Sequence, residues 1–200
     1  MEFVPGAGTV LPLFCAPPVS WFRLWVQNRL AITIDLPYQK QHYFNRFYIL
    51  GANAVLMNTI PVRRHSASVS LAEVEISVEQ NWPLRLARTF RFSYAGSAFY
   101  EHYWPAFAPV IEHPPRLLAA FNISVLQVFA SLLQLREPVI VTESCGYQVV
   151  PRDSWDSRRL VLPPQPKYFQ LFGDKFHPEL SIFDGLFNLG PDLVGYLNSF

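Results

Sequence analysis

The spacing of apolar residues changes along the sequence, and this change most limits what the chain can fold into. Before residue 80, short β-type runs predict strands at residues 9–16, 29–35, 43–50, 54–62 and 74–78. After residue 80, helices are expected over residues 82–94, 97–111 and 123–135, followed by one more short strand at 139–142. The sequence therefore predicts an α/β or mixed α+β fold: one central sheet of about five or six strands, covered by three or four helices, with a C-terminal helix pair.

Turn and capping residues predict where several of these elements begin and end. Gly51-Ala52-Asn53 separates two β-type runs and is typical of a hairpin turn. Ser97 and Asn122 are placed to cap the second and third helices of the central region. Pro105 and Pro109 are expected to kink or break the helix that begins after Ser97.

The C-terminal region carries the best-formed local signal in the sequence. Ser181-x-x-Asp184 is a capping box ahead of an apolar run, Gly190 is placed to end that helix, and Pro191 to begin another. At 100° per residue, Ser181, Asp184 and Asn188 fall on one narrow stripe opposite the apolar side.

Size and composition favour a single globular domain over residues 1–200, in which residues 146–167 form a long surface loop. The 16 basic and 15 acidic residues nearly cancel, so nucleic acid is not expected as a partner. No apolar run reaches the ~18 residues of a membrane span, and the two cysteines lack metal-type spacing. We therefore expect a cytoplasmic protein that forms a homo-oligomer or binds a protein partner through its aromatic-rich surface.

Three groups of motifs, in this order, cover nearly the whole chain. The first contains Pro17-Pro18-Val19-Ser20-Trp21-Phe22, Tyr38-Gln39-Lys40-Gln41, Asn45-Arg46 and Thr59-Ile60-Pro61-Val62. The second contains Asn81-Trp82, Tyr94, Phe99-Tyr100-Glu101 and Tyr103. The third contains Tyr168-Phe169-Gln170, Leu180-Ser181-Ile182-Phe183-Asp184 and Leu186-Phe187-Asn188-x-Gly190-Pro191. Together they resemble the short form of the WbqC-like protein family.

This resemblance implies a role in bacterial surface-polysaccharide (O-antigen-type) biosynthesis, as a transferase acting on a sugar or sugar-nucleotide intermediate. The alternative is a non-catalytic partner or scaffold of a glycan-biosynthesis enzyme. The chain departs from long members of the family at Phe14-Cys15-Ala16-Pro17, where they usually have a His-Gln-Pro-like motif, and at Leu86, where they often have histidine. No catalytic residue is identified by the sequence, and neither a cofactor nor a metal is expected.

The first group of candidate binding residues lies between two predicted strands and consists of Tyr38, Gln39, Lys40, Asn45 and Arg46. Loops at strand ends commonly carry function, and the lysine or the arginine could hold the phosphate of a sugar nucleotide. The alternative is an ordinary charged loop in which Arg46 pairs with an acid such as Asp35.

The second group of candidates consists of Gln170, Asp184 and Asn188. A carboxylate and an amide on one helix stripe could hold a sugar hydroxyl, but completion of the capping box and local hydrogen bonds explain the same pattern. If the protein is an enzyme, Gln39, Asn45, Arg46 and Gln170 should converge with Asp184 on one pocket.

Overall fold

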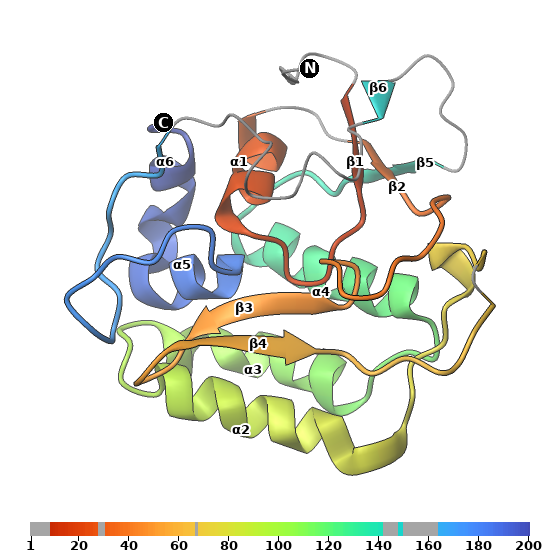
Figure 1. The fold of residues 1–200 in the computed structure, drawn as a ribbon. Helices are drawn as coiled ribbons and strands as arrows, with labels where there is room; N and C mark the ends of the chain where they lie inside the picture. Colours follow the sequence, from red (N-terminus) through yellow and green to blue (C-terminus); the bar gives the residue numbers. More distant parts are fainter. Residues whose placement is uncertain (1–8, 28–30, 67, 142–147, 150–163) are drawn as a thin grey trace.

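The computed structural model describes residues 9–27, 31–66, 68–141, 148–149 and 164–200, and these form a mixed α+β fold (Figure 1). The strands form a small parallel sheet and a separate β-hairpin, and helices make up much of the rest of the described chain. Buried side chains from the first strand to the last helix belong to one hydrophobic cluster.

The parallel sheet contains β1 (Thr9–Pro12), β2 (Ala31–Thr33), β5 (Val139–Val141) and β6 (Gln148–Val149), in the order β5-β2-β1-β6. The antiparallel hairpin contains β3 (Arg46–Leu50) and β4 (Val55–Thr59). The prediction of one central sheet with five or six strands is therefore wrong. The hairpin does not join the parallel sheet because other backbone occupies the outer edge of β3, where Ser181 N–H donates to the Tyr48 carbonyl at 2.7 Å.

The predicted hairpin turn is confirmed, since Gly51 N–H donates to the Ala54 carbonyl at 2.9 Å. The strand predicted at residues 74–78 is wrong. A 3₁₀ turn, η1 (Leu71–Glu73), precedes it, and the segment makes only isolated bridges, one from Ile76 to Val62 and one from Glu75 to Leu117. The alternation of polar and apolar residues over 74–78 therefore reflects bridges to two different segments, at Val62 and at Leu117, and not a continuous strand pairing.

Helix α1 (Val19–Gln27) begins directly after the Pro17-Pro18 pair. After a 3₁₀ turn, η2 (Glu79–Asn81), helix α2 (Trp82–Tyr94) has the predicted bounds. Helix α3 (Tyr100–Glu112) contains both Pro105 and Pro109 without a break. Both prolines lie on its exposed side, where water can satisfy the carbonyls that lose their N–H partners.

Two predicted caps are wrong. Ser97 lies outside α3, and its hydroxyl donates to the Tyr94 carbonyl at 2.8 Å. Helix α4 (Leu118–Leu132) starts four residues before Asn122, which is fully buried inside the helix. The Asn122 side-chain amide donates to the Phe44 carbonyl at 2.9 Å, so it holds α4 against the segment before β3.

The predicted C-terminal helix pair is present as α5 (Ile182–Leu189) and α6 (Leu193–Leu197), joined by the 3₁₀ turn η4 (Gly190–Asp192). Gly190 adopts φ +57°, and a Cβ at this position would lie 2.6 Å from the Phe99 ring, so the helix end requires glycine. Phe183 of α5 packs on Phe107 and Phe129 at ring-centroid distances of 4.7 and 4.9 Å.

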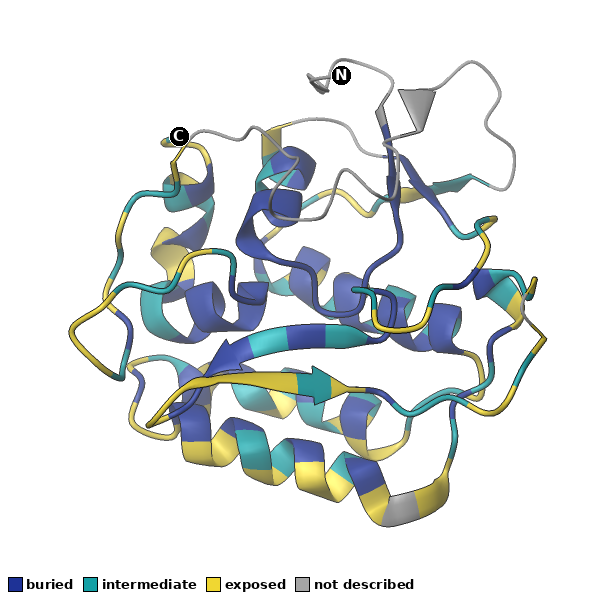
Figure 2. Ribbon diagram, in the orientation of Figure 1, coloured by how far each residue is buried: buried dark blue, intermediate teal, exposed yellow. Residues whose placement is uncertain are grey.

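Burial differs sharply between the two strands of the hairpin (Figure 2). Most of β3 is buried against the core, whereas β4 is almost entirely exposed. Within the described ranges, no helix is long and apolar enough to cross a membrane. The surface loop predicted at residues 146–167 lies mostly outside the described residues. Within it, Gln148–Val149 form β6 on the edge of the parallel sheet.

Candidate functional site

Asp184 lies at the centre of a buried polar network that we call the Asp184 network. Its side chain is completely buried in α5, with 0% exposure. The Tyr94 hydroxyl donates to Oδ1 at 2.8 Å, while the Tyr168 hydroxyl and Gln170 Nε2 donate to Oδ2 at 2.6 and 3.0 Å. Because these donors come from α2 and from the segment before α5, the carboxylate joins three parts of the chain.

The capping box predicted for α5 is half formed. The Ser181 hydroxyl caps the helix by accepting from Phe183 N–H at 3.4 Å, as predicted. The Asp184 carboxylate does not complete the box, because Ser181 N–H is already bonded to the Tyr48 carbonyl. The polar stripe of this helix is therefore an internal stripe that points toward Tyr94 and Tyr168.

Burial raises the pKa of Asp184, and the hydrogen bonds from Tyr168, Tyr94, Gln170 and Asn188 oppose that rise. Burial, together with the nearby carboxylate, raises the pKa of Tyr94 and of Tyr168 well above 10.0. The tyrosines therefore remain neutral, and the carboxylate is stabilised by O–H and N–H donors that carry no charge. Such an arrangement is suited to positioning the chain.

Gln170 connects this network to a surface loop. Its Nε2 also donates to the His177 carbonyl at 2.9 Å, and its Oε1 accepts from His177 N–H at 2.9 Å. The two bonds close the loop between residues 170 and 177. The shape of the loop thus depends on a side chain that is itself bonded to Asp184.

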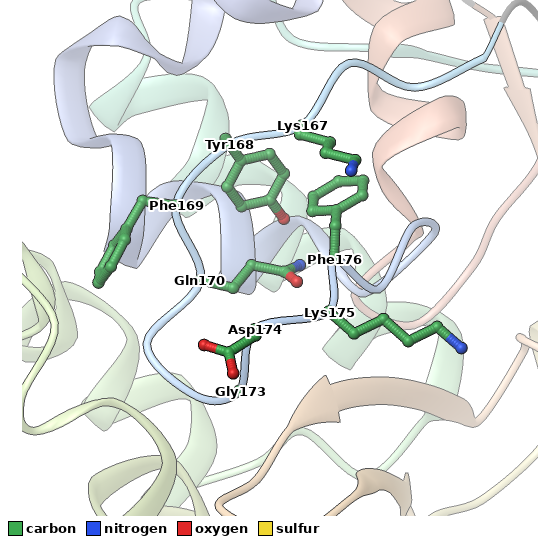
Figure 3. A pocket seen from close by; sticks show the side chains of 8 residues that line it. All are labelled: Lys167, Tyr168, Phe169, Gln170, Gly173, Asp174, Lys175 and Phe176. Carbon is green, nitrogen blue, oxygen red and sulfur yellow. The ribbon is translucent and has the colours of Figure 1, made fainter.

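The closed loop forms a pocket of about 310 Å³ (Figure 3). Its lining residues are Lys167, Tyr168, Phe169, Gln170, Gly173, Asp174, Lys175 and Phe176. Tyr168 and Gln170 point inward, whereas Phe169 and Lys175 extend outward on opposite sides of the loop. The pocket therefore combines aromatic rings with charges of both signs, and its inner wall is bonded to the Asp184 network.

The first group of candidates lies around the beginning of β3. Tyr38 is buried and its ring lies edge-on to His65, with 4.9 Å between centroids. Asn45 is buried and donates from Nδ2 to the Ile60 carbonyl at 2.9 Å. Gln39 is half-buried and Lys40 is exposed.

Arg46 does not form the ion pair with Asp35 that would have made this an ordinary charged loop. In the part of the chain that the structure describes, both ion pairs involve Glu75, one with Arg63 and one with Arg116. The first group thus retains an arginine without a carboxylate partner among the described residues.

The structure brings Gln170 and Asp184 together directly, and Asn188 joins them by donating from Nδ2 to the Asp184 backbone carbonyl at 2.9 Å. No described hydrogen bond links Tyr38, Gln39, Lys40, Asn45 or Arg46 to these three residues. Apart from the Ser181 N–H to Tyr48 carbonyl bond, β3 meets α5 through apolar side chains, with Phe47 packed on Phe183 at 6.4 Å between ring centroids. Side chains of adjacent strand residues point to opposite faces, so Arg46 points away from the face that meets α5.

Sequence reasoning did not select Tyr94 and Tyr168 as site residues, although both belong to the motifs noted above. Their hydroxyls are the donors that the buried carboxylate needs, and a tyrosine near a predicted buried acid is the signal that could have identified them. The arginines at positions 85, 88 and 91 are all exposed on α2, as expected of a solvated helix face.

The cysteine that the structure describes does not have a reactive thiol. Cys15 is buried, and burial raises the pKa of its thiol, so it is an inert core residue. Cys145 lies outside the described residues. Among the described residues, no cluster of three or more histidine, cysteine, aspartate or glutamate side chains could hold a metal ion.

In a comparison with known protein families, the model of the WbqC-like protein family matches residues 16–161. This chain belongs to the WbqC-like protein family. The match includes Tyr38, Arg46 and Tyr94, and it ends just before the pocket loop and α5. Comparisons with curated proteins and with solved structures found no match.

Proposed function

We propose that this WbqC-like protein binds a sugar or sugar-nucleotide intermediate of bacterial surface-polysaccharide biosynthesis and acts on it as a transferase. The observation that carries the proposal is the pocket at residues 167–176. Its volume falls at the lower end of the range common for small-molecule sites, about 300 to 1,000 Å³.

The chemistry of the pocket lining supports a carbohydrate ligand. The rings of Tyr168 and Phe176 offer apolar faces for the C–H face of a sugar, and Phe169, which is 71% exposed, extends this surface at the rim. Lys167 can contact a phosphate, while Asp174 can accept hydrogen bonds from sugar hydroxyls.

Within this proposal, Asp174 and Asp184 have different roles. Asp184 is sealed from solvent and bonded to three donors, so it fixes the loop and does not contact a ligand. Asp174 is exposed and lines the pocket. In glycosyl transfer an acceptor hydroxyl loses its proton as it attacks the anomeric carbon and the nucleotide phosphate leaves, and Asp174 is the carboxylate placed to take that proton.

A thermal-shift titration with a panel of nucleotide sugars tests this proposal. We expect saturable stabilisation of the wild type by at least one nucleotide sugar, and at least a tenfold weaker effect in Lys167→Met. Arg85→Met, which removes an exposed positive charge from α2, is the matched control and should bind as the wild type does. If no nucleotide sugar stabilises the wild type, the proposal is wrong.

A second function, as a non-catalytic partner of a glycan-biosynthesis enzyme, is favoured by the exposed strand β4. Val55, Leu56 and Met57 are 37%, 39% and 52% exposed, and the strand carries no charged residue or proline to protect its edge. For a partner role, Met57→Lys should abolish association with a co-purified glycan enzyme and leave nucleotide-sugar titrations unchanged. For a role based on the pocket alone, Met57→Lys should change neither.

A further inference from the structure

Arg46 is a half-buried cation whose hydrogen bonding is incomplete. It is the first residue of β3, and its Nε atom is buried without a hydrogen-bond partner among the described residues. No described ion pair includes it. A buried donor without an acceptor is costly, and folded proteins rarely keep one unless water or a ligand completes it.

Two further residues, His65 against Tyr38 and Asn45 next to Arg46 in the chain, also have a buried side-chain atom without a described partner. His65 donates from Nδ1 to the Ser66 carbonyl at 2.8 Å, while its Nε2 is buried with no partner among the described residues. The Oδ1 atom of Asn45 is also buried and unpartnered there. Arg46 is therefore accompanied by two polar groups that also have unused hydrogen-bonding capacity.

Tyr38 holds these groups in one place. Its ring contacts His65. Burial raises the pKa of Tyr38 to about 12, and the positive charge of Arg46 opposes this rise, so the guanidinium lies within electrostatic range of the phenol. The backbone reinforces this arrangement, because Tyr38 N–H donates to the Val69 carbonyl at 2.9 Å and Pro37 bridges to Ser70. The two segments are thus fastened together beside the beginning of β3.

We propose that Arg46, Tyr38 and His65 form a binding site for a phosphoryl anion, with Lys40 at its exposed edge. The free Nε–H of Arg46, with an adjacent Nη–H, can bind two phosphate oxygens side-on in a bidentate fork. The Tyr38 hydroxyl supplies a further donor, and His65 packs against the ring that carries it. A tetrahedral dianion can use donors arriving from several directions, which favours phosphate over a planar carboxylate.

This inference does not depend on the pocket at residues 167–176. It rests on unpartnered atoms at β3, whereas the proposed function rests on the lining of the loop before α5. Each can therefore fail without the other.

Calorimetric titration of the wild type with pyrophosphate, a sugar 1-phosphate and glucuronate, at constant ionic strength, tests the site. We expect saturable binding of both phosphorylated compounds, at least tenfold weaker binding in Arg46→Gln, and intermediate weakening in Arg46→Lys, which keeps the charge but loses the fork. Arg88→Gln, on the exposed face of α2, should bind as the wild type does. Lys167→Met should keep the pyrophosphate binding that Arg46→Gln weakens, which separates this site from the pocket.

The Arg46 side-chain Nε–H signal in a ¹⁵N-correlated NMR spectrum provides a second readout that needs no variant. Pyrophosphate should shift this signal in a saturable manner. The proposal is overturned if pyrophosphate does not bind, if Arg46→Gln binds it as well as the wild type, or if glucuronate is bound in preference to the phosphorylated compounds.

Discussion

Two of the buried polar regions in the described part of the fold differ in how many of their polar atoms are paired, although Asn188 Oδ1, next to the Asp184 network, is itself unpaired there. In the Asp184 network, both carboxylate oxygens accept hydrogen bonds from Tyr94, Tyr168 and Gln170. In the Arg46 cluster, which we define as Tyr38, Asn45, Arg46 and His65, three buried atoms have no partner among the described residues. Both regions border the same aromatic core.

The contrast separates stabilising polar groups from binding groups. A satisfied buried network fixes one arrangement of the chain, since every alternative leaves donors or acceptors unpaired. An unsatisfied cluster weakens the folded state until something binds to it. We therefore interpret Asp184 as a positioning residue for the pocket loop and Arg46 as a ligand-binding residue.

The largest expected effect comes from removing the centre of the satisfied network. Asp184→Ala leaves the Tyr94 and Tyr168 hydroxyls without their acceptor and removes one of the two acceptors of Gln170 Nε2. We expect a loss of about 3 kcal/mol or more in the free energy of unfolding. Urea denaturation measures this loss. Asp174→Ala, at an exposed position of the pocket loop, is the control and should change stability by less than about 0.5 kcal/mol. Equal stability of the two variants would contradict the proposed role of Asp184.

Removing one donor should have a smaller effect. Tyr94→Phe deletes the hydroxyl that bonds to Oδ1 at 2.8 Å and keeps the buried ring, so we expect a loss of about 2 kcal/mol by urea denaturation. Tyr168→Phe should cost a similar amount and should also weaken any ligand binding in the pocket, because this residue lines it. If Tyr94→Phe weakened ligand binding in the pocket and Tyr168→Phe did not, Tyr168 would not be the residue that positions the pocket loop.

The pH dependence of stability should carry the signature of Asp184. Its pKa in the folded protein is raised above the ordinary 3.8, so the folded state holds this proton more tightly than the unfolded state does. The stabilisation is complete below pH 3.8 and is lost as the pH rises through the raised pKa. Urea denaturation at a series of pH values should show this decline in the wild type. Asp184→Asn should lose the part of the decline that Asp184 causes. The part that comes from Glu179, whose pKa burial also raises, should be the same in both proteins.

The smallest expected effect concerns the unsatisfied region. Because Arg46 has no described ion-pair partner, Arg46→Met should leave the unliganded protein within about 0.5 kcal/mol of the wild type, or slightly more stable. Thermal and urea denaturation in phosphate-free buffer measure this difference. A loss above about 1.5 kcal/mol would mean that the guanidinium is structurally bonded, and the contrast between the two regions would not hold.

Local signals in the sequence predicted local structure well. The Gly51-Ala52-Asn53 turn and Gly190 at the end of α5 both act through their own backbone, so their effects are visible without the rest of the fold. Asn122 and Ser97 were misread as caps because tertiary partners, the Phe44 and Tyr94 carbonyls, use their side chains instead.

The sheet and the candidate site required information that the sequence does not display. Whether β3 joins β1 depends on which backbone reaches its outer edge, and that backbone comes from Ser181, far along the chain. From the sequence, Gln170, Asp184 and Asn188 are candidate binding residues, with helix capping and local hydrogen bonds as the alternative. The structure places these three side by side, and their contact with a ligand stays a prediction. It could not predict that Tyr94 closes the network, since Tyr94 and Asp184 are 90 residues apart.

Mapping ligand contacts by NMR tests the central claim most directly. In a ¹⁵N-labelled sample, pyrophosphate should perturb the backbone and side-chain signals of Arg46, Tyr38 and His65 in a saturable manner and leave those of α5 around Asp184 unchanged. Perturbations centred on Asp184, with none at Arg46, would contradict the assignment of the satisfied network to structure and of the unsatisfied cluster to binding.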